Sequence, residues 1–451
     1  EIKLWIKIFV YLFCMNRINF IKKTALMTSA GLLTHSPIAF GNPSKIIGSN
    51  EKIKFGTIGV NGMGWTDSMA LLKVPNVELV AICDVDNSVL EKRKYELDKS
   101  GIKVKVFSDY RNLLDDSEID AIIIGSPDHW HPLMMIHASE AGKHVYCEKP
   151  IGNSIGECNA MVKAQERYGN IVQVGQWQRS MKHFQDAVDF ISSGVLGPIR
   201  TVKVWCYQSW MRPNPIVPDS QPPKGVDYKK WLGPASLKPF NAGRFHFHFR
   251  WFWDYAGGLM TDWGVHLLDY ALLGMNSSYP KSITANGGRF AYPNLAQETP
   301  DTLFAVYEFD NFNLIWDSAM GIDNGSYGLN HGISFIGNYG TLVLNRKGWK
   351  VIEEKKNKSK IAKPYVRKTD NGLNNHLLNF IESIRANDPQ KVNCSIKDGA
   401  LVAKVAQMGN ISYRSGKKLF WDSTSDIFTN SRVNEDYVTN KYHNGYSLPK
   451  Y

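Results

Sequence analysis

A glycine-rich turn between two apolar runs is the feature that most constrains this chain. Residues 54–60 (KFGTIGV) form a short apolar run, the turn occupies 59–64 (GVNGMG), and a helical stretch follows at 65–72. A second buried strand at 77–83 (VELVAIC) ends at Asp84. This order of a strand, a glycine turn, a helix, a second strand and an acid is the layout of a dinucleotide-binding βαβ unit. We therefore predict an α/β Rossmann domain with a doubly wound parallel sheet.

The spacing within this unit favours NAD as the nucleotide. Glycines allow the backbone to approach a pyrophosphate, whose charge a helix N-terminus attracts. Asp84 lies 20 residues after Gly64, where a carboxylate can accept both hydroxyls of a ribose but would repel the 2′-phosphate of NADP. Asn61 stands at the second glycine position and tolerates positive φ better than most residues. The alternative interpretation is an ordinary glycine turn in an α/β domain.

The alternation of strands and helices continues to residue 150. A strand at 119–125 leads into 126–132 (SPDHWHP), a helix is predicted at 133–141, and a strand at 144–147 ends in 148–150 (EKP). Ligands of open parallel sheets bind at the carboxyl ends of the strands. A lysine at such an end, beside a nicotinamide, could help to deprotonate an alcohol. The alternative is a surface lysine in a turn.

A second motif, 257–269 (GGLMTDWGVHLLD), completes the family resemblance. Together with the EKP sequence at 148–150, it makes residues 52–422 resemble the glucose–fructose oxidoreductase, inositol dehydrogenase and rhizopine-catabolism (Gfo/Idh/MocA) oxidoreductases. The resemblance implies a Rossmann domain followed by an α+β domain with an open, largely antiparallel sheet, and a homo-oligomer, a dimer or a tetramer. It also implies three catalytic residues: Lys149, Asp262 and His266.

The spacing of the second motif supports this chemistry independently. On a helix from Met260 to Leu273, residues 262, 266 and 269 share one face. Asp262 could then orient His266, which would take the proton of a sugar hydroxyl while a hydride leaves from carbon. The alternative is a histidine with a structural role.

The pattern changes after residue 150. Helices are expected at 155–168, 181–193, 373–387 and 395–414, and strands at 198–209, 281–290, 302–309, 313–319, 332–337 and 341–345. Closely spaced strands with short turns indicate an antiparallel sheet. We expect a nucleotide domain at 52–150, a substrate and oligomerisation domain at 151–422, and a tail at 423–451 that wraps either the same subunit or a neighbour.

Two segments are candidates for contact with substrate. Residues 211–245 contain seven of the 20 prolines, and residues 177–263 contain seven of the 13 tryptophans. A long stiffened loop is often functional, and aromatic faces suit either sugar rings or a core. His246 and His248 would share one side of a strand and could join Asp262 in binding a metal, although we expect none. The predicted substrate-binding residues are Arg179, His246, Trp253, Tyr255 and His266.

The predicted cofactor site gathers the turn and the strand ends. Its residues are Gly59, Asn61, Gly62, Met63, Gly64, Asp84, Ser126, Pro127, His131, Glu148, Lys149 and Gln176.

The N-terminal residues are typical of an export signal. The first Met is Met15, so residues 1–14 are expected to be upstream read-through. Residues 15–41 have a basic start, a weakly apolar stretch and small residues, as a signal peptide does. They resemble a twin-arginine signal in which Ile18 replaces the second Arg. We expect a periplasmic or otherwise exported protein, with a cytoplasmic one as the alternative, and no membrane-spanning segment in the mature chain.

Composition narrows the function classes. The chain of 451 residues is 43% hydrophobic and 21% charged, which excludes disorder and coiled coil. Residues 1–41 carry five Lys or Arg and one acid, so the formal charge of +11 falls to +7 in the remainder. With no basic stripe or recognised module, nucleic-acid binding is not expected. None of the six cysteines forms a CxxC pair, which argues against a zinc knuckle.

These observations lead to one enzymatic hypothesis with alternatives. We expect an NAD-dependent oxidoreductase acting on a ring hydroxyl of a sugar or glycoside. Because soluble NAD is scarce outside the cytoplasm, an exported enzyme should hold its cofactor tightly and recycle it. An NAD-dependent glycosidase that uses transient oxidation and elimination is one alternative. A non-catalytic nucleotide-binding sensor on the same fold is the other.

Overall fold

A six-stranded parallel sheet forms the first domain. The computed structural model describes residues 51–211, 214–356 and 361–451, and the expected leader at 1–41 lies outside them. The strand order is β3-β2-β1-β4-β5-β6, and all neighbouring strands are parallel. The bounds are β1 (Ile53–Ile58), β2 (Val77–Cys83), β3 (Lys105–Phe107), β4 (Ala121–Ile124), β5 (His144–Cys147) and β6 (Val172–Val174). The predicted doubly wound Rossmann fold is confirmed.

The strand order reverses between β1 and β4, so a crevice opens at their carboxyl ends. All four residues of β4 are fully buried, because helices cover both faces of the sheet. The boundary predicted at residue 150 cuts off β6, a three-residue strand too short to show a periodic pattern.

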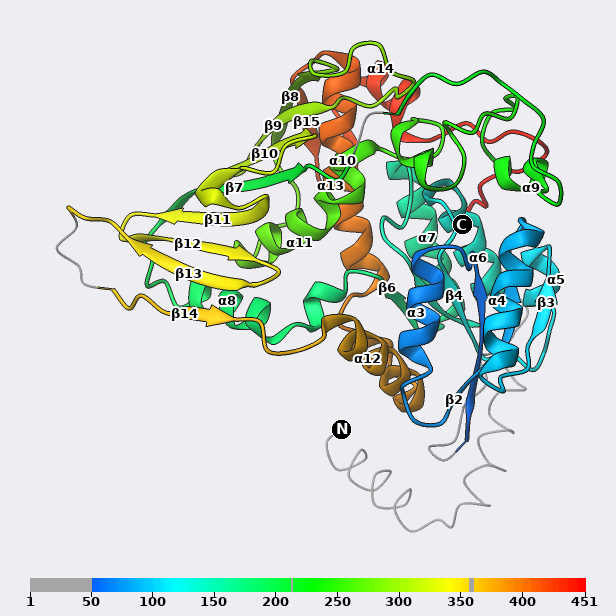
Figure 1. The fold of residues 1–451 in the computed structure, drawn as a ribbon. Coiled ribbons are helices and arrows are strands. Elements are labelled where there is room, and N and C mark those ends of the chain that lie inside the picture. The colour runs from blue at the N-terminus through cyan, green and yellow to red at the C-terminus, as the bar shows by residue number, and fades with distance from the viewer. Residues whose placement is uncertain (1–50, 212–213, 357–360) are drawn as a thin grey trace, which may run out of the picture. The chain divides into compact units, whose positions relative to one another are not determined.

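Helices from both ends of the chain cover this sheet. They are α3 (Met63–Leu71), α4 (Asn87–Lys99), α5 (Tyr110–Leu114), α6 (His131–Glu140), α7 (Ile155–Tyr168) and, from much later in the sequence, α12 (Gly372–Ala386). Helix α12 lies against α3 (Figure 1). Its Phe380 and Ile384 share a hydrophobic cluster with Phe55 of β1.

The second domain is built on a ten-stranded sheet in the order β14-β13-β12-β11-β7-β10-β9-β8-β15-β16. Its strands β7 and β10 are parallel, and the other pairs are antiparallel. The bounds are β7 (Ile199–Gln208), β8 (Ser282–Gly288), β9 (Thr302–Glu308), β10 (Asn313–Met320), β11 (His331–Gly337), β12 (Gly340–Asn345), β13 (Gly348–Glu353), β14 (Tyr365–Arg367), β15 (Leu419–Asp422) and β16 (Ile427–Phe428). The predicted open, largely antiparallel sheet is confirmed, and β13 to β16 add edge strands that we did not predict.

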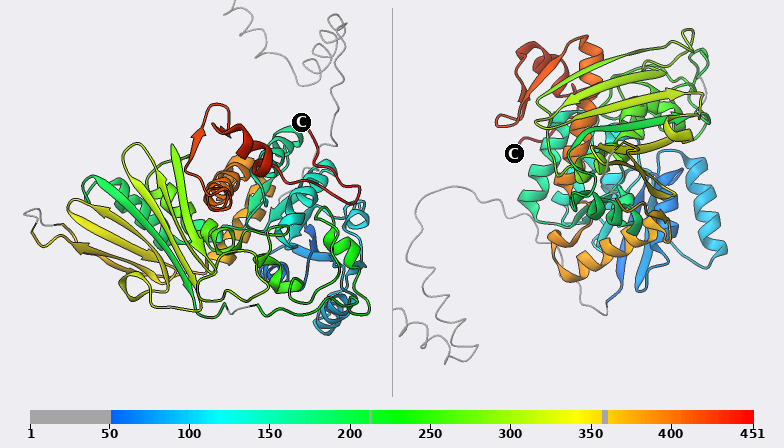
Figure 2. Two further views of the ribbon diagram at one scale, coloured as in Figure 1. Left: turned by 90° about the horizontal axis from the view of Figure 1, so that it is seen from above. Right: turned by 90° about the vertical axis from the view of Figure 1, so that its left-hand side faces the viewer.

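Helices pack on one face of the larger sheet (Figure 2). They are α8 (Lys182–Ser192), α11 (Gly264–Gly274) and α13 (Ile396–Ser415), and the short helices α9 (Tyr228–Leu232), α10 (Gly258–Asp262) and α14 (Ser431–Val433) lie in the connections. Helix α13 contacts both β8 of this domain and α7 of the first. No helix in the three described ranges is long and apolar enough to cross a bilayer.

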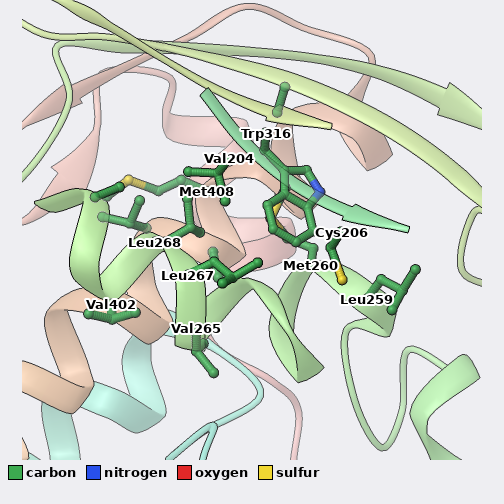
Figure 3. Close-up of a cluster of buried hydrophobic side chains, with 14 of the residues drawn as sticks. Val204, Cys206, Leu259, Met260, Val265, Leu267, Leu268, Trp316, Val402 and Met408 are labelled. Atoms are coloured by element: carbon green, nitrogen blue, oxygen red, sulfur yellow. The ribbon is translucent and has the colours of Figure 1, made fainter. Parts of the chain in front are cut away.

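Buried side chains fix the position of α10 and α11 against the large sheet (Figure 3). Met260 of α10 and Leu268 of α11 pack among residues of β7, β10 and α13, including Val204, Trp316 and Met408. Because protein interiors are close-packed, this cluster allows little movement of the residues that the two helices carry.

The single helix predicted from Met260 to Leu273 is wrong. Helix α10 ends at Asp262, and α11 begins at Gly264. Trp263 lies between them with φ −100°, outside the narrow range of an α-helix. The break falls beside a glycine, which favours helix interiors less than other residues except proline.

The C-terminal tail wraps the first domain of the same chain. The hydroxyl of Tyr442 donates to Glu157 of α7 (2.9 Å), and that of Tyr451 donates to Glu140 of α6 (3.0 Å). Tyr446 packs edge-on against Trp130, with ring centroids 5.3 Å apart. Of the two alternatives for the tail, the structure shows contact with its own subunit.

Candidate active site

One cavity of about 570 Å³ connects the carboxyl ends of β1, β2, β4 and β5 with the second domain. Its first half is lined by the glycine turn and Asp84. Its second half is lined by Lys149, Asp262 and His266. The glycine turn and the EKP sequence, which are far apart in the chain, therefore open into one space.

Two glycines shape the turn for a close backbone approach. Gly59 has φ +81°, and a Cβ there would lie 2.7 Å from the backbone nitrogen of Ser126. A Cβ on Gly64 would overlap the carbonyl oxygen of Gly59. A Cβ on Gly62 would instead enter open space beside the N-terminus of α3. Gly62 therefore leaves room for a ligand where the helix end favours negative charge.

Asp84 stands at the end of β2 and faces the cavity. Its carboxylate accepts backbone N–H groups of Val60 (3.0 Å) and Asp86 (3.1 Å). Burial raises the pKa of Asp84, while these two hydrogen bonds oppose the increase. An oriented carboxylate at this point suits ribose hydroxyls.

The first half of the cavity fits NAD. Ser126 Oγ and Glu148 Oε1 are buried and have no hydrogen-bond partner among the residues that the structure describes. Both residues line the cavity, as do Gly62 and Asp84. A dinucleotide site needs three features that are present here: polar atoms without partners, a space beside a helix N-terminus, and an acid at the end of the next strand.

Lys149 and Asp262 form the central ion pair of the second half. Lys149 Nζ donates to the carboxylate of Asp262 (3.0 Å) and to its backbone carbonyl (2.8 Å), and Arg250 Nε also reaches the carboxylate (3.4 Å). Burial alone would raise the pKa of Asp262, but these two cations lower it to about 2. Asp262 is thus ionised at neutral pH and holds the Lys149 ammonium in place.

His266 provides a neutral imidazole beside this pair. It is only 5% exposed, and its Nδ1 has no hydrogen-bond partner within the described ranges. Burial lowers its pKa well below the usual value, and the charges of Lys149 and Arg346 lower it further. The expected pairing with Asp262 is corrected, because the carboxylate of Asp262 binds Lys149 and Arg250 instead.

Asp128, which follows β4, adds a buried acid to the cavity. It is 6% exposed, and burial raises its pKa to about 8 although Arg250 and Lys149 oppose the increase. Burial likewise raises the pKa of Glu148 to about 7. Asp128 is therefore protonated at neutral pH and can donate a proton.

Replacing Asp128 with Asn should change how stability depends on pH. The folded protein holds the Asp128 proton up to about pH 8, whereas an unfolded chain releases it at about pH 3.9. Asp128 therefore stabilises the fold fully only below pH about 4 and loses this contribution as the pH rises to about 8. The Tm of the Asn variant, relative to the native protein, should rise between pH 5 and pH 8. The same Tm difference at both pH values, as expected for the exposed control Asp323→Asn, would contradict the assignment.

Comparisons with known proteins agree with this geometry. A family model described as "Oxidoreductase family, NAD-binding Rossmann fold" matches residues 53–176, and its companion, "C-terminal alpha/beta domain", matches residues 188–291. The chain belongs to the Gfo/Idh/MocA oxidoreductase family. It is an NAD-binding member, which confirms the predicted cofactor.

Three similar proteins illustrate the family. The uncharacterized oxidoreductase YrbE of Bacillus subtilis (strain 168) is 25% identical over 84% of this chain and 99% of its own. A glycosyl hydrolase family 109 protein of Shewanella sp. (strain MR-4) is 30% identical over 34% of this chain and 37% of its own. A levoglucosan dehydrogenase in complex with NADH has the same fold, with a TM-score of 0.64 and 18% identity over 82% of this chain and 98% of its own.

Most of the predicted cofactor residues of this family member lie together. Those that line the cavity are Gly59, Asn61, Gly62, Met63, Asp84, Ser126, Pro127, His131, Glu148 and Lys149. Gly64 lies beneath the turn, and Gln176 lies outside the lining, where its Oε1 accepts from Cys394 Sγ (3.3 Å). The two ring nitrogens of His131 approach the carbonyls of Pro150 (2.7 Å) and Ser126 (2.8 Å), which ties the EKP turn to the β4 loop.

The predicted substrate residues divide into two groups. His246 and His266 line the cavity. Arg179 does not, because Asp269 (2.6 Å) and Asp398 (3.1 Å) take up its guanidinium, and Tyr255 is buried against Trp231. The Trp253 ring packs beneath the guanidinium of Arg414 and lines a separate pocket of about 140 Å³.

The predicted strand carrying His246 and His248 is wrong, because these residues form a 3₁₀ helix, His246–Trp251. His246, with φ +48°, bridges Asn61 (3.2 Å) and Asp86 (3.0 Å) of the nucleotide domain. Its side chain therefore faces the nucleotide half of the cavity. Among the described residues, no group of three or more His, Cys, Asp or Glu side chains is arranged to hold a metal.

The proline-rich loop also joins the nucleotide domain. Within the described part of this loop, Asp227 N donates to the carbonyl of Val85 (2.9 Å), and Asn87 N donates to that of Gly225 (3.1 Å). Lys230 and Trp231, further along, line the cavity. The loop thus forms a wall of the nucleotide half.

Sequence reasoning missed several residues that line the cavity: Trp177, Phe247, Arg250, Trp263, Arg346, Lys368 and Tyr446. Trp263 lies within the motif at 257–269, and Trp177 follows the predicted cofactor residue Gln176, so these two positions could have been inferred from their neighbours. Arg346 and Tyr446 lie in a strand turn and in the tail, where no local pattern marks a site.

Proposed function

We propose that the protein is an NAD-dependent oxidoreductase that acts on a ring hydroxyl of a sugar or glycoside. One observation carries the proposal: the Lys149–Asp262 pair and the neutral imidazole of His266 line the same cavity as the dinucleotide cradle. The name of the levoglucosan dehydrogenase that shares the fold supports a carbohydrate substrate.

The side chains supply what oxidation of an alcohol requires. When bound, NAD supplies the hydride acceptor. Neutral His266 takes the hydroxyl proton, and Lys149 Nζ donates a hydrogen bond to the oxygen as it becomes negative. Asp262 keeps the ammonium of Lys149 oriented through its hydrogen bonds of 2.8 and 3.0 Å. Trp177 and Trp263 narrow this half of the cavity and limit access of water.

Contacts between the two domains support a tightly held, recycled cofactor. The proline-rich loop, His246 and Tyr446 all wall the nucleotide half and are bonded to or packed on the Rossmann domain. Release of a dinucleotide would require several of these contacts to open. The expected export of the chain adds a reason for retention, and it remains our proposal.

Mass spectrometry of the denatured protein, followed by a panel of sugars and glycosides, tests the proposal. We expect NAD to remain after gel filtration and at least one sugar to change the absorbance of the bound nicotinamide. A protein without nucleotide that changes no compound, even with added NAD, would contradict the proposal and favour a non-catalytic role.

Protonated Asp128 favours a second candidate, an NAD-dependent glycosidase. Elimination of an aglycone after oxidation of the ring requires an acid near the leaving oxygen, and Asp128 lines the cavity with a pKa of about 8. The name of the Shewanella relative is consistent with this. Release of nitrophenol from nitrophenyl glycosides without net formation of NADH would distinguish this activity from simple dehydrogenation.

We also propose that the chain forms a homo-oligomer, a dimer or a tetramer. The outer side of the ten-stranded sheet exposes Phe304 (42%), Ile352 (40%), Tyr365 (66%) and Phe420 (51%). Large apolar side chains exposed along one face of a sheet are typical of protein–protein contact.

A further inference from the structure

A stack of Trp177, Arg346 and Trp263 closes the second half of the cavity, on the side of His266. The guanidinium carbon of Arg346 lies 4.8 Å from the ring centroid of Trp177 and 4.4 Å from that of Trp263. Both indole rings also approach His266, with centroids 6.1 and 6.4 Å from its ring. Arg346 therefore lies next to the group that we propose to take the substrate proton.

Gln178 fixes the orientation of this guanidinium. Nε and Nη2 of Arg346 both donate to Gln178 Oε1, at 3.2 and 3.1 Å. Gln178 is buried, and its own amide donates to the backbone carbonyl of His266 (3.3 Å). The amide thus links Arg346 to α11, and because it binds Nε and Nη2, the Nη1 of Arg346 has no hydrogen-bond partner among the described residues and can bind a ligand.

Arg346 forms no ion pair with any carboxylate of the described residues, although the charge of Asp262 acts on it from a distance. Within the described residues, its hydrogen-bond partner is a neutral amide and its other contacts are the two indole rings. Burial lowers the pKa of Arg346 to about 10, so it stays charged at neutral pH. A charge removed from water is normally paired. The missing carboxylate can come from a ligand.

Positive charge exceeds negative charge throughout this half of the cavity. Asp262 is already shared by Lys149 and Arg250, and Asp128 is protonated at neutral pH. Lys368 adds a further cation at the rim, next to Arg346, because its backbone N–H donates to the carbonyl of Lys347 (2.9 Å). A negatively charged substrate would be attracted into this region.

We propose that the substrate is a sugar that bears a carboxylate, a uronic acid or uronide, and that Arg346 binds this carboxylate. The planar fork of a guanidinium matches a carboxylate and discriminates it from a hydroxymethyl group. The inference rests on the proposed oxidoreductase function and narrows its substrate class. Lys368 assists from the rim, and Gln178 is a positioning residue.

Matched pairs of methyl glycosides test the inference directly. Methyl glucuronide, galacturonide and mannuronide would be compared with the parent glucoside, galactoside and mannoside. Binding to the purified, NAD-loaded protein would be followed by quenching of tryptophan fluorescence and by calorimetry. In at least one series, we expect the acid to bind about 10- to 100-fold more tightly, the range of a hydrogen bond between charged groups. Glucose 6-sulfate in the same titration shows whether any anion suffices or a planar carboxylate is required.

Three variants assign the preference to Arg346. Arg346→Met keeps an unbranched apolar chain between the indoles and should lower the ratio of the two affinities to about one. Arg346→Lys keeps the charge without the fork and should give an intermediate ratio. The control Lys347→Met removes the exposed neighbouring cation, which does not line the cavity, and should leave the ratio unchanged.

The outcomes separate this inference from the proposed function. The inference is wrong if neutral sugars bind at least as tightly in every series, or if Arg346→Met weakens binding of acids and parents equally. Oxidation of neutral sugars without preference for acids would overturn the inference but would still support the proposed oxidoreductase function. Tight binding of a uronide that never changes the absorbance of the bound nicotinamide would support carboxylate binding at Arg346. It would contradict the proposed oxidoreductase function.

Discussion

Replacing Lys149 with Met should lower turnover of any sugar substrate by about 10²- to 10⁴-fold, the usual contribution of a positioned acid or base. Asp262 orients the ammonium of Lys149. In the proposed reaction, this ammonium stabilises the developing negative charge on the hydroxyl oxygen. The loss should appear in kcat, because the interaction strengthens as the charge develops. Steady-state rates and bound-NAD content, measured on the same preparation, check this result.

The control for this prediction is Lys163→Met, which removes an exposed lysine of α7 far from the cavity lining. It should leave turnover within about twofold of the native rate, as surface substitutions usually do little. A Lys149→Met protein that retains NAD and full activity would show that the reaction centre is elsewhere.

The second large effect is expected for Gly59→Val, which should abolish retention of NAD and destabilise the protein. Gly59 has φ +81°, a conformation that costs a branched residue about 1–3 kcal/mol. In addition, the new Cβ would lie 2.7 Å from the backbone nitrogen of Ser126, so the turn would have to move. Thermal unfolding and mass spectrometry of the bound nucleotide measure the two losses.

Gly101→Val is a matched control for backbone strain. Gly101 has φ +74°, but a Cβ there meets nothing within 4 Å, and the residue lies outside the cavity lining. This variant should lose stability through strain alone and keep its NAD. Equal retention of NAD in both variants would contradict the role assigned to the glycine turn.

The nucleotide domain could be predicted from the sequence because its signals are local. The turn at 59–64, the acid at residue 84 and the EKP sequence each depend on neighbours a few residues away. Strand ends in a parallel sheet meet at one edge, so these local signals also indicated which residues would share the cavity. The preference for NAD over NADP followed from Asp84 alone.

The substrate half could be predicted only in part, because its residues meet through tertiary packing. Arg346 follows β12 and Trp177 follows β6, so no spacing rule relates them. Arg179 looked like a ligand-binding cation, but its guanidinium is paired with Asp269, which lies one turn beyond His266 in α11 and does not line the cavity. The break at Trp263 also changed which side chains meet Asp262.

The bound nicotinamide of the purified protein provides the most direct test of the central claim. Its absorbance would be recorded, without added cofactor, after a sugar or uronide from the panel is mixed with the native protein, Lys149→Met or His266→Asn. We expect NAD to be present in all three proteins and to be reduced rapidly only in the native one. Absence of nucleotide from the native protein, with no reduction of added NAD by any compound, would contradict the account.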